Sequence, residues 1–219
     1  DVEIISEASI EGLQYYLSGT TTNGSFSLES DMPYEVILNN TEITSLTNVP
    51  LNLSKNIERN IIIANGTTNI LSDSEDSDGK AVINSKGATN ISGFGSLTIN
   101  ANKKHGISSD NDINIDGATI SINHSADASK GLKSDCNIMI TDGDVNIVSS
   151  GTLTLEALDL GYDATYCTSI GADGNFEMRG GKLNITLPVS NEAGRGIKTD
   201  GDISVSGGEI NIVSHSGGD

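Results

Sequence analysis

Aliphatic and polar residues alternate along most of this chain, in short runs separated by glycine, asparagine and aspartate. Ile113 and Ile115 form one such pair, and Ile120 and Ile122 form the next, with the turn dipeptide Asp116-Gly117 between them. Alternation with a period of two is typical of β-strands with one buried face, whereas an amphipathic helix needs a period of 3.6. The pattern therefore predicts short strands joined by tight turns.

The same pattern recurs in four segments, which begin at Gly106, Gly131, Ser169 and Gly196. When these segments are aligned on their starts, five columns are apolar in every row. The columns are Ile107/Leu132/Ile170/Ile197, Ile113/Ile138/Phe176/Ile203, Ile115/Ile140/Met178/Val205, Ile120/Val145/Leu183/Ile210 and Ile122/Ile147/Ile185/Ile212. A unit of this size cannot bury its own apolar face, but stacking on its neighbours buries a continuous core. We therefore predict an all-β solenoid, a right-handed single-stranded parallel β-helix with one segment per coil.

The repeat predicts a single domain over residues 1–219. Coils that stack at the interstrand distance of ~4.8 Å would number about eight. Residues 36–219 are expected to form stacked coils, and residues 1–35, which fit the repeat poorly, an N-terminal cap or irregular coils. The wider spacing between the segments that start at 131 and 169 predicts an insertion at about 151–168.

Stacking would also align polar residues into rows. One row is wholly acidic, and a second row lies two residues further along each segment. The rows are Asp110, Asp135, Asp173 and Asp200, and Asp112, Asn137, Asn175 and Asp202. Carboxylates ~4.8 Å apart repel one another by ~1 kcal/mol per pair in water. Bound Ca²⁺ would offset this repulsion, as would Lys133 and Lys198, which precede their aspartates by two residues. Alternatively, each aspartate closes a turn by bonding its own backbone.

The densest acidic segment is 73–79, in which Asp73, Glu75, Asp76 and Asp78 precede a glycine. These residues resemble a calcium loop without the downstream glutamate of an EF-hand, and a solvated loop is the alternative. The predicted insertion offers a second metal or ligand candidate. It contains Glu156, Asp159 and Asp163 beside Tyr162 and Tyr166.

The net charge of −18 argues against non-specific binding to nucleic acid or anionic membranes, which requires lysine and arginine. No apolar run is long enough for a transmembrane helix. The positive residues cluster near the coil starts, and stacking would align them into a stripe. Those predicted to bind ligand are Lys104, Lys130, Lys133, Arg195 and Lys198. Such a stripe suits an anionic polymer such as a uronic-acid glycan, or else it forms ion pairs with the aspartate row.

We predict no catalytic residue. The histidines lack zinc-site spacing, and the nucleophile motif Gly-x-Ser-x-Gly does not occur. Carboxylate pairs, as used in glycoside hydrolysis, recur in every coil and so single out no site. Cys136 and Cys167 flank the predicted insertion, where they form either a disulfide that pins it or two free thiols.

The stretch from Val36 to Ile212 resembles bacterial secreted proteins described as calcium-binding, carbohydrate-binding β-helix proteins. The resemblance rests on Val36–Ile43, on Asn69–Asp73 with its acidic loop, on Ile91–Ile99, and above all on the row from Gly196 to Ile212. It implies a pectate-lyase-like β-helix, Ca²⁺ in the corner turns, and a secreted or cell-surface location after removal of a signal peptide. It also implies non-catalytic binding to plant cell-wall polysaccharide such as cellulose or pectin.

Two other functions stay open at this point. The first is a pectin-degrading lyase or hydrolase on the same scaffold, in which Lys133, Lys198 or Arg195 would abstract a proton. The second is a structural or adhesive spacer that retains no glycan. In the family, coils often begin with Asp-Gly, whereas here only Asp78-Gly79 keeps this pair. This departure favours the polyanion stripe over calcium at the later corners.

Overall fold

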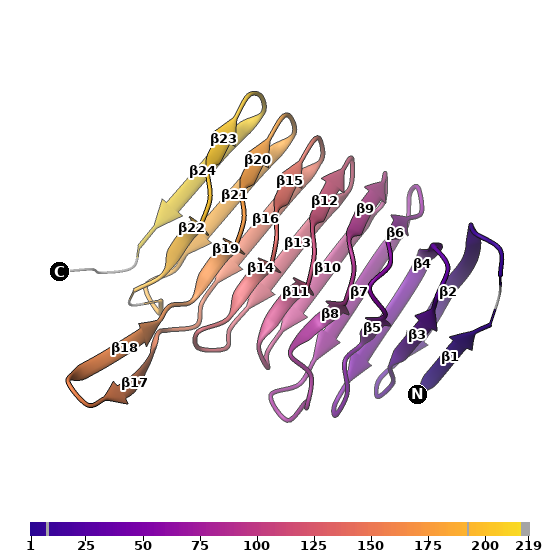
Figure 1. Ribbon diagram of the computed structural model, residues 1–219, viewed down its shortest axis with the longest axis horizontal. Coiled ribbons are helices and arrows are strands. Elements are labelled where there is room, and N and C mark those ends of the chain that lie inside the picture. The colour runs from indigo at the N-terminus through magenta and orange to yellow at the C-terminus, as the bar shows by residue number, and fades with distance from the viewer. Residues whose placement is uncertain (8, 192, 216–219) are drawn as a thin grey trace.

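A computed structural model describes residues 1–7, 9–191 and 193–215 of the chain. Within these residues the protein is entirely β, and its strands wind into a stack of parallel coils that runs from the N-terminal to the C-terminal end (Figure 1). The alternating residues dictate this arrangement, because each coil can bury its aliphatic side chains only against the coils above and below it. The predicted parallel β-helix is confirmed.

The first sheet contains one strand from each of eight coils, and we call it face 1. Neighbouring strands are parallel throughout. In order across the sheet, the strands are β1 (Val2–Ser6), β3 (Phe26–Ser30), β5 (Leu51–Ser54), β8 (Ala81–Ser85), β11 (His105–Ser109), β14 (Lys130–Ser134), β19 (Thr168–Ala172) and β22 (Arg195–Thr199).

The second sheet has 14 strands and bends into two further faces. We call these face 2 and face 3. The bend between them lies within β4 (Tyr34–Ser45), whose first half pairs with residues 59–63 in face 2 and whose second half pairs with residues 70–73 in face 3. Asn40 lies between the halves with a positive φ of 55°, a conformation that asparagine tolerates. The strand β2 (Leu13–Thr21) pairs along both halves of β4.

Faces 2 and 3 are built from short strands that follow one another within each coil. On face 2 they are β6 (Arg59–Ile63), β9 (Thr89–Gly93), β12 (Ile113–Asp116), β15 (Ile138–Ile140), β20 (Phe176–Met178) and β23 (Ile203–Val205). On face 3 they are β7 (Thr68–Asp73), β10 (Ser96–Ala101), β13 (Thr119–His124), β16 (Asp144–Ser149), β21 (Lys182–Leu187) and β24 (Glu209–Ser214).

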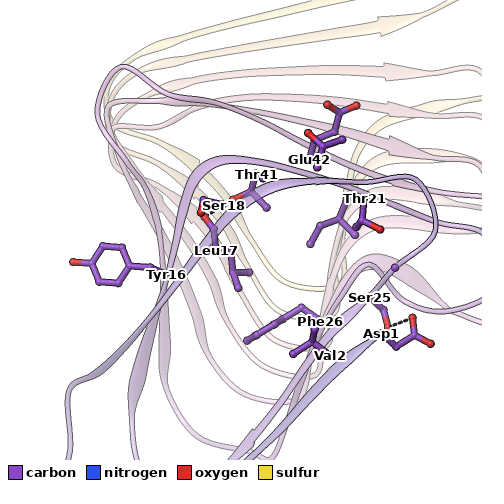
Figure 2. Close-up of a pocket in the computed structure, with 14 residues that line it drawn as sticks. Asp1, Val2, Tyr16, Leu17, Ser18, Thr21, Ser25, Phe26, Thr41 and Glu42 are labelled. Carbon is purple, nitrogen blue, oxygen red and sulfur yellow. Dashed lines mark hydrogen bonds between the residues drawn. The ribbon is translucent and has the colours of Figure 1, made fainter.

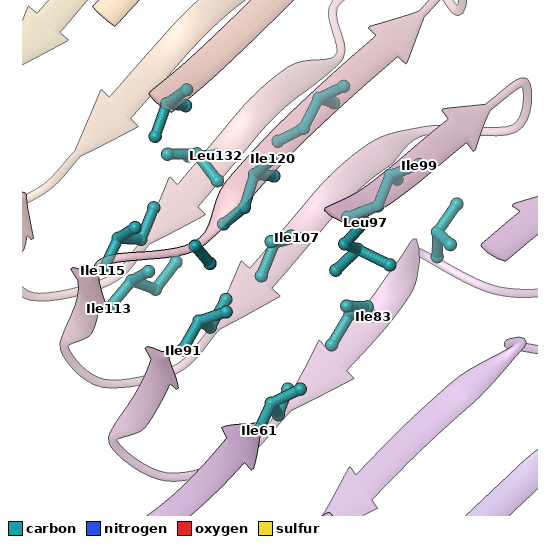
Figure 3. Close-up of a cluster of buried hydrophobic side chains, with 14 of the residues drawn as sticks. Ile61, Ile83, Ile91, Leu97, Ile99, Ile107, Ile113, Ile115, Ile120 and Leu132 are labelled. Carbon is teal, nitrogen blue, oxygen red and sulfur yellow. The ribbon is translucent and has the colours of Figure 1, made fainter. Parts of the chain in front are cut away.

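The five apolar columns predicted from the repeat are ladders of directly paired residues. Ile113, Ile138, Phe176 and Ile203 are consecutive partners, and the other four columns pair in the same way. Ile91 continues the Ile115 ladder one coil down, and its side chain belongs to the buried core (Figure 3). The core is therefore one continuous column of mostly aliphatic side chains.

Residues 1–35 contribute β1, β2 and β3, which pair in parallel with the following coil, and the start of β4. The pairing of β2 with β4 shifts register between Leu17 and Gly19. A pocket of about 320 Å³ opens there beside Phe26 and Thr41, where the Ser25 hydroxyl donates to Asp1 Oδ1 at 3.0 Å (Figure 2). The first coil is thus irregular, and none of the predicted site residues lines its pocket.

The segment predicted as an insertion forms an antiparallel hairpin of β17 (Thr154–Leu158) and β18 (Gly161–Thr165). It projects from the stack between β16 and β19 (Figure 1). Cys136 and Cys167 are both free thiols, so the alternative of a disulfide that pins the hairpin is wrong. The part of the chain that the structure describes has no helix long and apolar enough to cross a membrane.

Candidate functional site

The outer surface of face 1 carries a row of lysines beside a row of aspartates. Each row follows from strand alternation, because in β14 Leu132 and Ser134 point inward while Lys133 points outward. Lys133 is paired with Ser108 in the coil below and with Gly171 in the coil above, and Gly171 is paired with Lys198. We call the positions of Lys133, Gly171 and Lys198 the lysine row.

Asp110, Asp135, Asp173 and Asp200 form the predicted aspartate row at the end of face 1. Their backbone amides continue the ladder, each donating to a carbonyl oxygen of the coil below at 3.0 to 3.1 Å. Three of the carboxylates contact a lysine: Lys86 pairs with Asp110 at 2.8 Å, Lys133 with Asp135 and Lys198 with Asp200. Alternating charges therefore relieve the repulsion expected along the row.

The second polar row closes the corner between faces 1 and 2. In this row a backbone N–H of one coil donates to the side-chain oxygen of the coil below. Asn137 donates to Asp112 at 2.9 Å, Asn175 donates to Asn137 at 2.9 Å, and Asp202 donates to Asn175 at 2.8 Å. These bonds run between coils, not within one turn as in the predicted Asx turn. The row braces the stack, with Asp202 at its upper end.

The carboxylates of the acidic segment 73–79 do not converge on a single point. Asp73 is buried, and its Oδ1 accepts the amides of Asn102 at 2.6 Å and Lys103 at 3.2 Å, while Glu75, Asp76 and Asp78 are exposed. Burial raises the pKa of Asp73. Across residues 1–7, 9–191 and 193–215, no group of three or more His, Cys, Asp or Glu side chains is placed to hold a metal. The residues present do not fit a calcium site, and calcium binding stays a prediction.

A groove of about 520 Å³ runs along face 1 next to the two rows. Lys80, Lys86 and Lys133 lie along it with Asp78, Asp110 and Asp135. His105 is 8% exposed at this groove, and its Nδ1 accepts the backbone amide of Lys130 at 2.9 Å. Burial, followed by the nearby charges of Lys104 and Lys130, lowers the pKa of His105 to about 3. His105 is therefore neutral and a poor general base at neutral pH.

Of the two predicted aromatic residues, Tyr166 lies where the hairpin joins face 1. The Arg195 guanidinium carbon lies 3.7 Å from the centroid of the Tyr166 ring, a cation–π contact in which Arg195 is exposed at the start of β22. Tyr162 lies further out on β18 and is 72% exposed, outside the lysine row. In the hairpin Glu156 is paired with Asp163. Among the described residues no third His, Cys, Asp or Glu side chain joins these two to form a metal site.

Gly171 and Arg59 are the important residues that sequence reasoning missed. For Gly171 a signal existed, because the aligned segments place Lys133, Gly171 and Lys198 in one column. For Arg59 no signal existed, because it lies before the regular repeat and yet is only 1% exposed inside the core. The predicted Lys104 lies just before β11, half-buried, where its charge acts on His105.

A family model described as carbohydrate-binding domain-containing protein matches residues 2–219. A carbohydrate-binding domain-containing protein of Acetivibrio thermocellus is 30% identical over 118 residues, which cover 49% of this chain and 41% of the relative. The chain therefore spans less than half of that relative's length.

A solved structure shares the architecture. It is described as the polysaccharide lyase-like protein from C. thermocellum, in a gadolinium derivative, and it superimposes with a TM-score of 0.66 at 20% identity over 97% of this chain and 88% of that one. At this identity the likeness shows the fold alone. The match of the family model over almost the whole chain shows more, and this chain belongs to the family of carbohydrate-binding domain-containing proteins.

Proposed function

We propose that this protein binds an acidic plant cell-wall polysaccharide, polygalacturonate, along face 1 without cleaving it. The observation that carries the proposal is the lysine row, which extends the groove of face 1 towards the Arg195–Tyr166 pair. An elongated face with cations on several coils suits a chain with a carboxylate on each sugar ring. The family to which the chain belongs supports a carbohydrate ligand.

The chemistry of face 1 argues against a lyase. Abstraction of a proton from a uronate requires a free base that faces the sugar, but the side chains of Lys133 and Lys198 are engaged in ion pairs with Asp135 and Asp200. The guanidinium of Arg195 offers hydrogen-bond donors and no proton acceptor, and it is stacked on Tyr166. These residues therefore suit binding better than proton transfer.

Two measurements test the proposal together. The protein should be retained on polygalacturonate, and the doubly substituted variant K133M/K198M should lose about tenfold or more in affinity. The control K182M removes one charge from face 3 and should leave the affinity unchanged. Unsaturated sugars or new reducing ends after incubation would instead establish an enzyme, and retention of no glycan on an array would indicate a spacer.

A second candidate is a neutral glucan such as cellulose, bound on face 2. There a row of outward amides runs across the coils: Asn90 donates to Asn60 at 3.1 Å, Asn114 donates to Asn90 at 2.9 Å, and Gln14 donates to Glu35 at 2.7 Å. A groove of about 420 Å³ follows this row. Loss of cellulose binding in N90L/N114L, with polygalacturonate binding intact, would establish this second face.

A further inference from the structure

The lysine row of face 1 has a gap in its middle. Lys133 and Lys198 occupy two of its positions, and each pairs with the aspartate two residues ahead. Between them stands Gly171, which has no side chain and leaves Asp173 without a lysine from its own strand. This gap separates the two lysine–aspartate pairs of the row.

Lys130 from the coil below fills the gap. If Gly171 carried a Cβ atom, that atom would lie 2.7 Å from Cδ, 2.9 Å from Cε and 3.4 Å from Nζ of Lys130. The lysine therefore extends across the bare backbone of Gly171, into the space that a side chain at that position would take. A Cβ at this position would displace the end of the lysine side chain, so glycine permits this path of Lys130.

The ammonium of Lys130 differs from those of its neighbours in having no counterion in contact. Lys133 and Lys198 each contact a carboxylate, whereas Lys130 makes no ion pair within 4.0 Å among the described side chains. Its side chain is half-buried, and it feels the repulsion of Lys133 and Lys198. Burial and these two charges lower the pKa of Lys130, although Asp173 and Asp135 act in the opposite direction.

A partly desolvated cation between two others is most stable when an anion joins it. We infer that the ammonium of Lys130, where its side chain extends over Gly171, is an anion subsite that binds the carboxylate of one uronic acid residue. Lys133 and Lys198 flank this carboxylate in the coils below and above. The inference rests on the proposed function, since it names the position on face 1 where a uronate is recognised most strongly.

Polygalacturonate affinity of two variants tests the inference. K130A should bind about tenfold more weakly than the natural protein, because one charge-assisted contact is lost. In K130A/G171K the stem of residue 130 is gone, so a lysine at position 171 has room and restores the row. This variant should recover most of the affinity. K182M, on face 3, is the control for net charge, and thermal melts should show that all variants are folded.

The outcomes separate this inference from the proposed function. Natural affinity in K130A, with affinity lost in K133M/K198M, would overturn the subsite and leave glycan binding on face 1 intact. A K130A/G171K variant as weak as K130A would also overturn it, because a positive charge returned to this place would then not contribute to binding. No binding of polygalacturonate by the natural protein would overturn both. Fully methyl-esterified pectin, which lacks the carboxylates, should bind the natural protein and K130A equally, and a loss with K130A there would contradict carboxylate recognition.

Discussion

The buried guanidinium of Arg59 donates a hydrogen bond from Nη1 to the Ser85 hydroxyl of the next coil at 2.8 Å. The same group donates to the carbonyl oxygens of Leu53 and Ile57, at 2.7 Å each, and to that of Lys55. It also lies 5.8 Å from the centroid of the Tyr34 ring. A single cation thus satisfies the carbonyls of the turn between β5 and β6, and burial lowers its pKa.

Replacement of this residue should destabilise the protein strongly. Arg59→Met keeps much of the side-chain volume but removes the donor from the half-buried carbonyl oxygens of Lys55 and Ile57, while that of Leu53 keeps only the amide of Lys86. We expect the free energy of unfolding to fall by about 3 kcal/mol, measured by urea denaturation. Arg179→Met is the matched control, because Arg179 is exposed and pairs with Glu177 on the surface. Equal stability of the two variants would show that the carbonyls find other partners.

The Arg195–Tyr166 contact should position a charge for glycan binding. Removal of the ring in Tyr166→Ala frees the guanidinium, and polygalacturonate affinity should fall about threefold, the typical strength of an exposed cation–π contact. Arg195→Ala should lower it further. Affinity electrophoresis at two salt concentrations measures both effects, since loss of Arg195 should also reduce the salt dependence.

A double-substitution cycle decides how Tyr166 acts. If the ring acts only by holding Arg195, the combined variant should bind no more weakly than Arg195→Ala alone. Independent losses that add would show that Tyr166 contacts the sugar itself. Tyr162→Ala, on the outer part of the hairpin, is the control and should bind as the natural protein does.

The fold could be derived from sequence because one physical rule repeats. Each coil stacks on the next in fixed register, so the alignment that paired Ile113 with Ile138 and Phe176 also gave the sheet pairing. Before residue 81 the rule weakens. There β4 runs continuously through a corner, and the buried charge of Arg59 replaces aliphatic packing. Neither feature follows from alternation.

The site was predictable in composition but not in detail. Stacking placed the aspartates in one row and the lysines beside them, as the alignment indicated. The path of a long side chain is a different matter, since whether Lys130 extends over Gly171 depends on side-chain packing between coils. The acidic loop shows the converse limit. Its spacing matched a calcium loop, yet Asp73 points into the protein because alternation along β7 gives it an inward position.

Acid should destabilise the protein through two buried histidines. Burial lowers the pKa of His105 to about 3 and that of His124 to about 4, from an ordinary value of 6.5. Between pH 6.5 and pH 4 these two histidines therefore bind protons in the unfolded chain but stay neutral in the folded protein. The stability that is present above pH 6.5 is lost as the pH falls towards 4. The raised pKa of Asp73 acts in the opposite direction and offsets part of this loss.

The urea midpoints of unfolding at pH 7.5 and pH 4.5 measure this loss of stability. The loss should be larger in the natural protein than in a variant that lacks one of the two histidines. In His105→Gln an amide oxygen can still accept the Lys130 amide, and its stability should depend less on pH. His124 bonds the hydroxyls of Ser129 at 2.7 Å and Ser149 at 2.5 Å and is less easily replaced. An identical pH dependence in His105→Gln would show that other groups control acid unfolding.

Calcium binding by the acidic loop is the remaining prediction from the sequence, and the arrangement of the loop gives it a sharp test. Asp73 already accepts two backbone amides through Oδ1, and Asp76 and Asp78 are exposed without converging on it. We therefore expect a chelator to leave the melting temperature unchanged and D76N/D78N to melt like the natural protein. A drop on chelation that D76N/D78N abolishes would instead establish Ca²⁺ in this loop. Polygalacturonate retained in the presence of chelator would separately show that lysines, and not a metal bridge, hold the glycan.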